Sequence, residues 1–268
     1  MSYKTILMHV EPTPGSEARL QAAAELSDKL GAQLIGLGGR ASMIRVAPLA
    51  VAEGGSYAVQ TWAEDEAHAL AEVEATFHKV APGAIWRRAP DYPIDALCDN
   101  AAGADLIITG LERAGTDFAP NAADTVLRSG LPVLALPAGH LQIGVERLVI
   151  AWKDTREARR AVSDALPLLR RASEVAVVSV STGSGVAATP ASIENLINRL
   201  ARHGVNAVVE PVSTRHDAGE KLINFATSRR ADLIVAGAFG HSRAGEWLLG
   251  GMTQTLLECS TLPLLFSH

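Results

Sequence analysis

The chain of 268 residues contains only two cysteines, Cys98 and Cys259, and they form no C-x-x-C pair. So few cysteines exclude a small secreted scaffold held by disulfides, and their spacing excludes a dithiol redox motif. We expect both to be buried free thiols. The eight histidines show neither H-x-x-x-H nor H-E-x-x-H spacing, so the sequence predicts no metal site.

Long hydrophobic runs and a surplus of positive charge are also missing. No apolar run approaches the roughly 18–20 residues that a membrane helix needs. The first ten residues, MSYKTILMHV, lack the basic start and cleavage site of a signal peptide. The net charge is −5, without basic clusters. We therefore expect a cytoplasmic protein with neither a membrane nor a nucleic acid as partner.

What the chain does contain is an internal repeat. The segment ADLIITG at 104–110 is mirrored by ADLIVAG at 231–237, an offset of 231 − 104 = 127. The segment LPVL at 131–134 is mirrored by LPLL at 262–265, an offset of 262 − 131 = 131. A repeat of this length indicates two copies of one domain, and 268 residues with 48% hydrophobic content suffice for two cores.

The copies span residues 1–140 and 144–268. In both, a first strand leads into an alanine-rich helix that opens with Glu-Ala, at 17–18 and 157–158. We expect strands near 4–10, 33–37, 84–88, 105–109 and 133–136, and near 147–152, 174–180, 206–211, 232–236 and 264–266. We expect helices near 16–30, 57–80, 93–101 and 121–129, and near 156–171, 190–203, 217–229 and 251–259.

The expected strands are apolar throughout instead of alternating, as when helices cover both faces of a parallel sheet. Regular βα alternation predicts an open, doubly wound α/β fold with the ligand site at the carboxyl ends of the strands. The segment at about 38–56 of the first copy is a glycine-rich insertion with an apolar middle. It is either a lid over a crevice or a tolerated surface insertion.

A glycine motif follows the fourth strand of the second copy. Gly237 is separated from Gly240 by two residues, and nine residues later come Gly250 and Gly251, where a helix is expected to begin. Glycines allow the backbone to approach a ligand, and the N–H groups of a helix's first turn favour an anion. The alternative is a set of glycines that only let the loop fold.

The spacing G-x-x-G, nine residues, G resembles the signature of the universal stress protein family, in which a Ser or Thr follows the last glycine. Gly251 stands at that hydroxyl position here. The resemblance implies tandem Rossmann-like (adenine nucleotide α-hydrolase-like) domains, each with five parallel strands in the order 3-2-1-4-5. It also implies an intrachain pseudo-dimer paired through the last strands, with a further homodimer possible, and ATP with Mg²⁺ as ligand.

In the family, an Asp just after the first strand contacts the adenine or ribose. Lys153 occupies that position here and Asp154 follows it, so Asp154 is the candidate, whereas Asp154 or Thr155 as a simple helix cap is the alternative. Arg243 would neutralise phosphate charge. Thr253 could offer a hydroxyl near the position that Gly251 occupies, although we expect its hydroxyl to face solvent. The nucleotide-binding residues implied are Asp154, Gly237, Gly240, His241, Ser242, Arg243, Gly250, Gly251, Met252 and Thr253.

The first copy is four residues shorter between the matched segments, 131 − 127 = 4, and the missing residues belong to the glycine motif. Arg113 stands opposite Gly240, and Pro120, which has no N–H, stands opposite Gly251. We therefore expect nucleotide binding in the second copy only.

Three functions compete. The first is a stress-response protein that binds an adenine nucleotide, with slow ATP hydrolysis at most, because no residue set resembles catalytic machinery. The second is a regulatory or interaction protein on the same scaffold that has lost the nucleotide, which Lys153 and Gly251 favour. The third, an enzyme of the wider adenine nucleotide α-hydrolase group, would need an S-G-G-x-D-S type motif near the first strand, and the chain has none there.

Overall fold

The computed structural model describes residues 2–38, 56–89, 91–111, 120–139, 142–182, 188–214, 217–239 and 251–268. The strands are β1 (Thr5–His9), β2 (Gln33–Gly38), β3 (Ile85–Arg88), β4 (Leu106–Gly110), β5 (Val133–Leu136), β6 (Arg147–Ala151), β7 (Glu174–Thr182), β8 (Ala207–Thr214), β9 (Leu233–Gly237) and β10 (Leu264–Ser267). The helices are α1 (Pro14–Leu30), α3 (Ser56–Val80), α4 (Pro93–Asn100), a 3-10 turn (Ala101–Gly103), α5 (Ala122–Ser129), α6 (Arg156–Leu169), α7 (Pro190–Arg202), α8 (Ala218–Ser228) and α9 (Gly251–Cys259).

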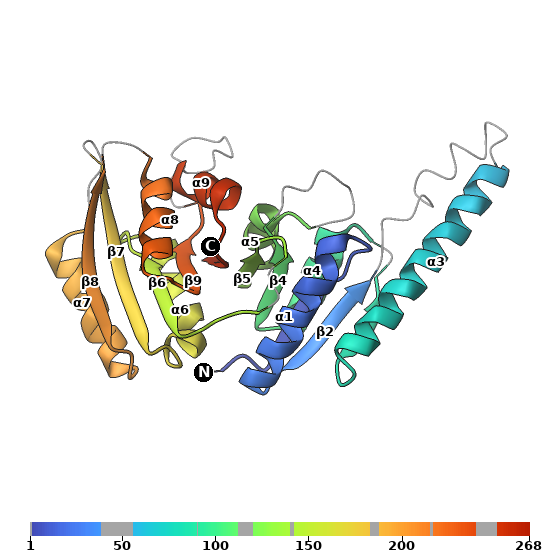
Figure 1. Ribbon diagram of the computed structural model, residues 1–268, viewed down its shortest axis with the longest axis horizontal. Coiled ribbons are helices and arrows are strands. Elements are labelled where there is room, and N and C mark those ends of the chain that lie inside the picture. Colours follow the sequence, from blue (N-terminus) through green and yellow to red (C-terminus); the bar gives the residue numbers. More distant parts are fainter. Residues whose placement is uncertain are drawn as a thin grey trace.

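All strands form one sheet of ten, in the order β3-β2-β1-β4-β5-β10-β9-β6-β7-β8 (Figure 1). Within each half the order is 3-2-1-4-5 and every pairing is parallel, which confirms the predicted topology. The last strands of the two halves, β5 and β10, pair antiparallel, with Leu134 opposite Leu265. The two halves therefore resemble a dimer built within one chain.

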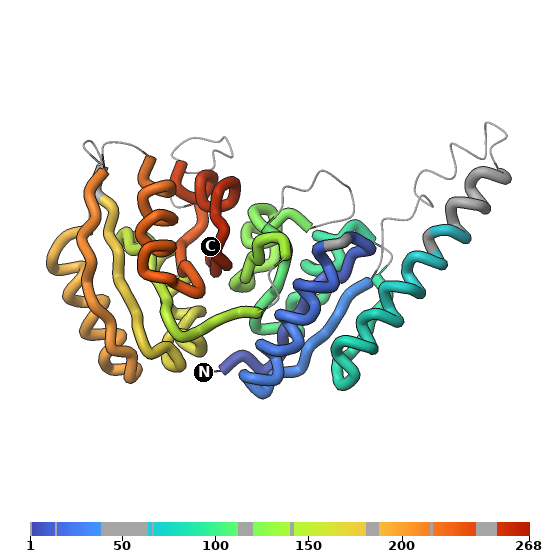
Figure 2. The backbone as a smooth tube through the Cα atoms, viewed as in Figure 1, coloured from blue at the N-terminus to red at the C-terminus, as the bar shows by residue number. Residues whose placement is uncertain are grey.

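Helices cover both faces of this sheet, because the strand residues are apolar on both sides. One buried cluster joins α1, α3, α6 and α7 to the sheet, and a second joins α4, α5, α8 and α9 to the opposite face. Each cluster contains residues of both halves. Figure 2 shows the chain crossing between the halves along the lower side, just before β6.

Two expectations about the cysteines are wrong. Cys259, the last residue of α9, is exposed, and Cys98 in α4 is only partly buried. Burial still raises the pKa of the Cys98 thiol, since a thiolate is poorly solvated there. Most of the predicted insertion near 38–56 lies outside the described residues; Gly38 ends β2 and Ser56 begins α3.

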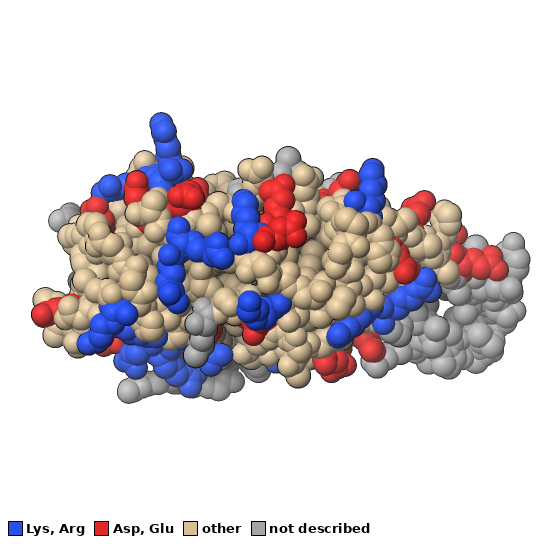
Figure 3. All heavy atoms as spheres, turned by 90° about the horizontal axis from the view of Figure 1, so that it is seen from below, with Lys and Arg blue, Asp and Glu red and all other residues tan. Residues whose placement is uncertain are grey.

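Acidic and basic side chains are interspersed on the face seen in Figure 3, and neither sign forms a continuous block. Among the described residues, no helix is long and apolar enough to cross a bilayer.

Candidate functional site

The candidate site lies where β6 and β9 end side by side. These parallel neighbours place Ala151 opposite Ala236, at the point where the strand order of the second half reverses. Trp152 then anchors the end of β6: its backbone N–H donates to the Val178 carbonyl at 2.8 Å, and its indole Nε1 donates to Ser192 Oγ at 3.2 Å. Because the tryptophan is fixed, the turn that follows it has a defined direction.

Lys153 and Asp154, the next two residues, are exposed. Thr155 caps α6, since its Oγ1 accepts a hydrogen bond from the Ala158 N–H at 3.3 Å. The alternative that a residue of this turn serves as a helix cap is therefore correct for Thr155. Asp154 instead accepts a hydrogen bond from Arg159 Nε at 2.8 Å, in an ion pair at the surface.

Gly237, the last residue of β9, has a structural role that the sequence did not indicate. A Cβ at this position would lie 2.5 Å from the Ala158 nitrogen and 2.6 Å from the Glu157 carbonyl carbon. Real Cβ atoms do not approach backbone this closely, so only glycine lets α6 pack against the end of β9. The glycine is needed for packing whether or not a ligand binds.

Glu157 is buried beside this contact, in the first turn of α6, with 5% of its side chain exposed. Burial raises the pKa of its carboxyl, but hydrogen bonds from Arg156 and from the first turn of the helix outweigh burial, and the net pKa is lowered. The carboxylate thus stays charged, and it is paired with Arg156.

The helix α9 begins at Gly251 beside this edge of the sheet. Gly251 is exposed, and no atom of the described residues lies within 4 Å of the place where its Cβ would stand. Met252 is partly buried and packs against the apolar cluster that includes α8. Thr253 is buried, with 7% of its surface exposed, so the prediction that its hydroxyl faces solvent is wrong.

The remaining candidates, Gly240, His241, Ser242, Arg243 and Gly250, lie in 240–250, outside the described residues. Of the predicted set, the structure therefore brings Asp154 and Gly237 to neighbouring strand ends and places Gly251, Met252 and Thr253 in the first turn of α9. Among the residues that the structure describes, no three His, Cys, Asp or Glu side chains form a group that could hold a metal ion.

The equivalent place in the first half is filled by its own side chains. Both the first strand and the first helix repeat with an offset of 142 (147 − 5 and 156 − 14), so Arg19 of α1 corresponds to Ala161 of α6. The Glu-Ala pairs of the sequence repeat with an offset of 140. The residues of these pairs therefore do not occupy equivalent positions in the two helices, because the structural offset is two residues larger. The Arg19 guanidinium lies against Gly110, with Nη1 2.9 Å from where a Cβ would stand.

Arg19 is 2% exposed and forms an ion pair with Glu11, which is equally buried. His9 Nδ1 lies 3.8 Å from the Glu11 carboxylate. Burial raises the pKa of Glu11, but the neighbouring His9 ring and the Arg19 guanidinium outweigh burial, so the net pKa is lowered. Sequence reasoning missed this network, because the repeated Glu-Ala pairs align Arg19 with another arginine, Arg159.

The helix α5 corresponds to α9, and a side chain already binds an N–H group of its first turn. Asn121 caps this helix, with Oδ1 accepting from the Ala123 N–H at 2.8 Å, and Pro120 precedes the cap. The absence of an anion site from the first copy stays a prediction.

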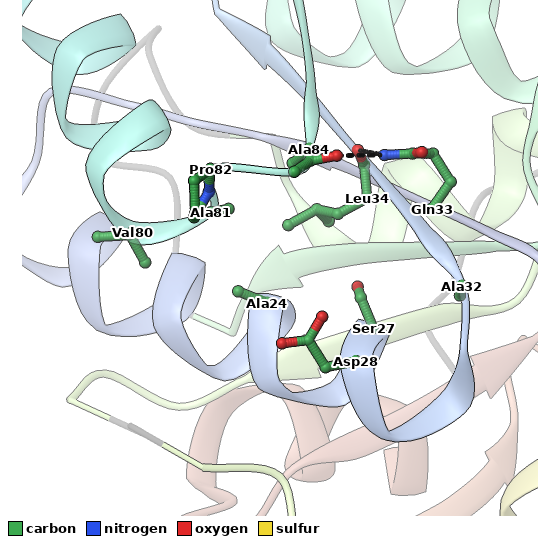
Figure 4. Close-up of a pocket in the computed structure, with 11 residues that line it drawn as sticks. Ala24, Ser27, Asp28, Ala32, Gln33, Leu34, Val80, Ala81, Pro82 and Ala84 are labelled. Atoms are coloured by element: carbon green, nitrogen blue, oxygen red, sulfur yellow. Dashed lines mark hydrogen bonds between the residues drawn. The ribbon is translucent and has the colours of Figure 1, made fainter.

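A pocket of about 220 Å³ lies elsewhere, at the other end of the first half, between α1, α3 and the starts of β2 and β3 (Figure 4). Its polar groups are largely engaged: Gln33 Nε2 donates to the Leu34 and Gly83 carbonyls at 3.1 Å, and Ser27 Oγ donates to the Ala23 carbonyl at 2.7 Å. Because its lining residues belong to the first half, the pocket is separate from the ends of β6 and β9, where the glycine motif lies.

Comparisons with known proteins agree with this architecture. Residues 144–268 match the model of the Universal stress protein family. The chain is similar to a universal stress protein from Archaeoglobus fulgidus DSM 4304, with 16% sequence identity and a TM-score of 0.70, covering 98% of this chain and 95% of that one. It is also similar to a functionally unknown protein from Pseudomonas aeruginosa PAO1, with 15% identity and a TM-score of 0.61, covering 99% and 92%.

No curated protein matches the chain. At such identities the solved structures establish a shared fold, and they do so over both halves. The second half, residues 144–268, thus matches the universal stress protein family, and both halves of the chain share the fold of the solved universal stress protein.

Proposed function

We propose that the second domain binds an adenine nucleotide, ATP with Mg²⁺, at the carboxyl ends of β6 and β9, and that the protein acts in a stress response as a nucleotide-dependent regulator. The observation that carries the proposal is the start of α9. Gly251 opens that helix, and no atom of the described residues stands within 4 Å of where its Cβ would lie. Exposed N–H groups of a helix's first turn favour phosphate.

The contrast with the first domain supports this assignment to the second domain alone. There, Asn121 already satisfies a first-turn N–H of α5, and the Arg19–Glu11 pair fills the space beside Gly110. The buried ion pair takes up space beside Gly110, and the cap already engages one N–H group that a phosphate would need. Any nucleotide would therefore bind in a ratio of one per chain.

The residues described at the site favour binding and release over hydrolysis. Glu157 is the buried carboxylate nearest to the turn, and its lowered pKa and its pairing with Arg156 make it a weak base. With no resident metal cluster among the described residues, Mg²⁺ would arrive with the phosphates of the nucleotide.

Calorimetric titration with Mg-ATP tests the proposal, using variants of Gly251. Gly251→Ser supplies the hydroxyl that the family has at this position. A hydrogen bond to a charged phosphate contributes about 1.5–3 kcal/mol, so we expect binding at least about tenfold tighter than in the unmodified chain. Gly251→Asp should abolish binding, because it places a negative charge against the phosphates. Gly103→Ser, also in open space but in the first domain, is the matched control.

A regulatory protein that has given up the nucleotide is the second candidate. It is favoured by the Asp154–Arg159 ion pair, which engages the carboxylate expected to contact the nucleoside, and by Lys153 at the family's Asp position. Absence of binding at millimolar ATP, in both the unmodified chain and Gly251→Ser, would overturn the nucleotide proposal in favour of this candidate.

A further inference from the structure

Phe239, the second residue after β9, has a left-handed backbone with φ of 62°. Residues other than glycine rarely adopt this backbone conformation. Among the described residues Arg230 shares it, with φ of 51°, but Arg230 ends a helix. The N–H groups of Arg230 and Ala231 both donate back to the last turn of α8, at 2.9 Å, as in a Schellman motif. Phe239 follows a strand, so no helix end explains it, and outliers of this kind concentrate at ligand sites.

Contacts with the end of β10 hold the strained residue in place. The Ala238 N–H donates to the Ser267 carbonyl at 2.9 Å, which extends the β9–β10 ladder past Gly237. The Ala238 carbonyl, which belongs to the peptide leading into Phe239, lies 3.1 Å from Nδ1 of His268. The His268 ring also packs edge-on against the Phe239 ring, with centroids 6.3 Å apart and an interplanar angle of 70°. The His268 side chain thus contacts both the peptide that leads into Phe239 and the Phe239 ring.

The first domain provides an internal comparison. With the offset of 131 found for the last strands, His268 corresponds to Pro137, which has no donor group to offer. The backbone bond is common to both domains, since the Leu111 N–H donates to the Leu136 carbonyl at 2.7 Å. The histidine contact is particular to the domain that keeps the full glycine motif.

We propose that His268 is a positioning residue for the nucleotide site of the second domain. Its Nδ1–H donates to the Ala238 carbonyl and its ring packs against Phe239, so that the two contacts fix the left-handed backbone at Phe239 after the end of β9. Both the neutral ring protonated at Nδ1 and the imidazolium can donate this hydrogen bond. The ligand named here rests on the proposed function, whereas the contact with Phe239 does not.

The test compares His268→Ala with His268→Asn, because the asparagine Nδ2 stands where the histidine Nδ1 does and restores the donor. Two quantities are measured: the Kd for Mg-ATP, and the rate at which trypsin cleaves after Arg243 in the ligand-free protein, followed by mass spectrometry. We expect His268→Ala to raise the Kd about tenfold and to accelerate cleavage, and we expect His268→Asn, which restores the donor without the ring, to recover part of both changes. His203→Ala, an exposed histidine after α7, is the control and should change neither.

Unchanged cleavage and affinity in His268→Ala would overturn the inference. A cleavage rate in His268→Asn equal to that of His268→Ala would overturn it too, because the hydrogen bond to the Ala238 carbonyl would then have no effect on the turn. If the unmodified chain binds no ATP, the proposed function fails, and the cleavage rates alone still decide whether His268 positions this turn.

Discussion

Glu11 is a carboxylate held charged inside the first domain by Arg19 and His9. Since its folded pKa is lowered, the stability that it contributes is present above its unfolded value of 4.5 and is lost as the pH falls through the folded pKa. We expect Glu11→Gln to destabilise the protein by about 3–5 kcal/mol at pH 7, because the buried guanidinium of Arg19 loses its ion pair with Glu11. Urea unfolding at pH 7 and near pH 4 should show a smaller loss on acidification for Glu11→Gln than for the unmodified chain.

The control is the double variant Glu11→Ala with Arg19→Ala, which mimics the alanine found at this place in the second domain. Its cost should be clearly less than the sum of the two single variants, since neither charge is then left alone. Equal pH dependence in Glu11→Gln and the unmodified chain would contradict the assigned role of the carboxylate.

Gly237 and Gly251 belong to the same sequence motif, but the structure predicts opposite responses to alanine. A Cβ at Gly237 meets the backbone of α6 at 2.5 Å, so Gly237→Ala should destabilise by about 1–3 kcal/mol. A Cβ at Gly251 meets nothing, and Gly251→Ala in the first turn of α9 should be neutral or stabilising by up to about 1 kcal/mol. Guanidinium unfolding of the two variants measures the difference. Equal losses of unfolding free energy would contradict the structural role assigned to Gly237.

At the scale of elements, the sequence predicted all ten strands and the helices around them, because apolar runs alternate with 3.6-residue patterns bounded by clear breakers. The helix α9 was expected at residues 251–259 and lies there. The start of α6 shows what a pattern cannot resolve: Asp154 and Thr155 are both good caps, and only the geometry assigns the cap to Thr155.

The same limit explains the site residues that were missed or misjudged. Burial of Thr253 depends on how α9 packs beside α8, which a one-dimensional pattern does not contain. The role of Gly237 depends on an approach between β9 and α6, which are far apart in sequence. The first domain's Arg19 reads as an ordinary helix residue until the fold places it under Gly110. Long-range packing decided each of these cases.

At the scale of the whole molecule, the two domains share their cores. The β5–β10 pair buries Leu134 and Leu265 completely, and both apolar clusters run through the two halves. Tyr3, ahead of β1, donates a hydrogen bond to the Asp164 carbonyl in α6 and so adds a further contact between the halves. Such sharing couples the unfolding of one domain to that of the other.

We therefore expect a single thermal transition by calorimetry, although tandem domains commonly unfold in separate steps. Leu265→Ala should lower that one transition as a unit, because it removes buried contact from the junction at a cost of about 2–5 kcal/mol. Val208→Ala on the edge strand β8, where the side chain is 61% exposed, is the matched control and should stay within about 0.5 kcal/mol. Two resolved transitions, with only the second-domain transition lowered in Leu265→Ala, would mean that the β5–β10 pair joins the domains without coupling their stability.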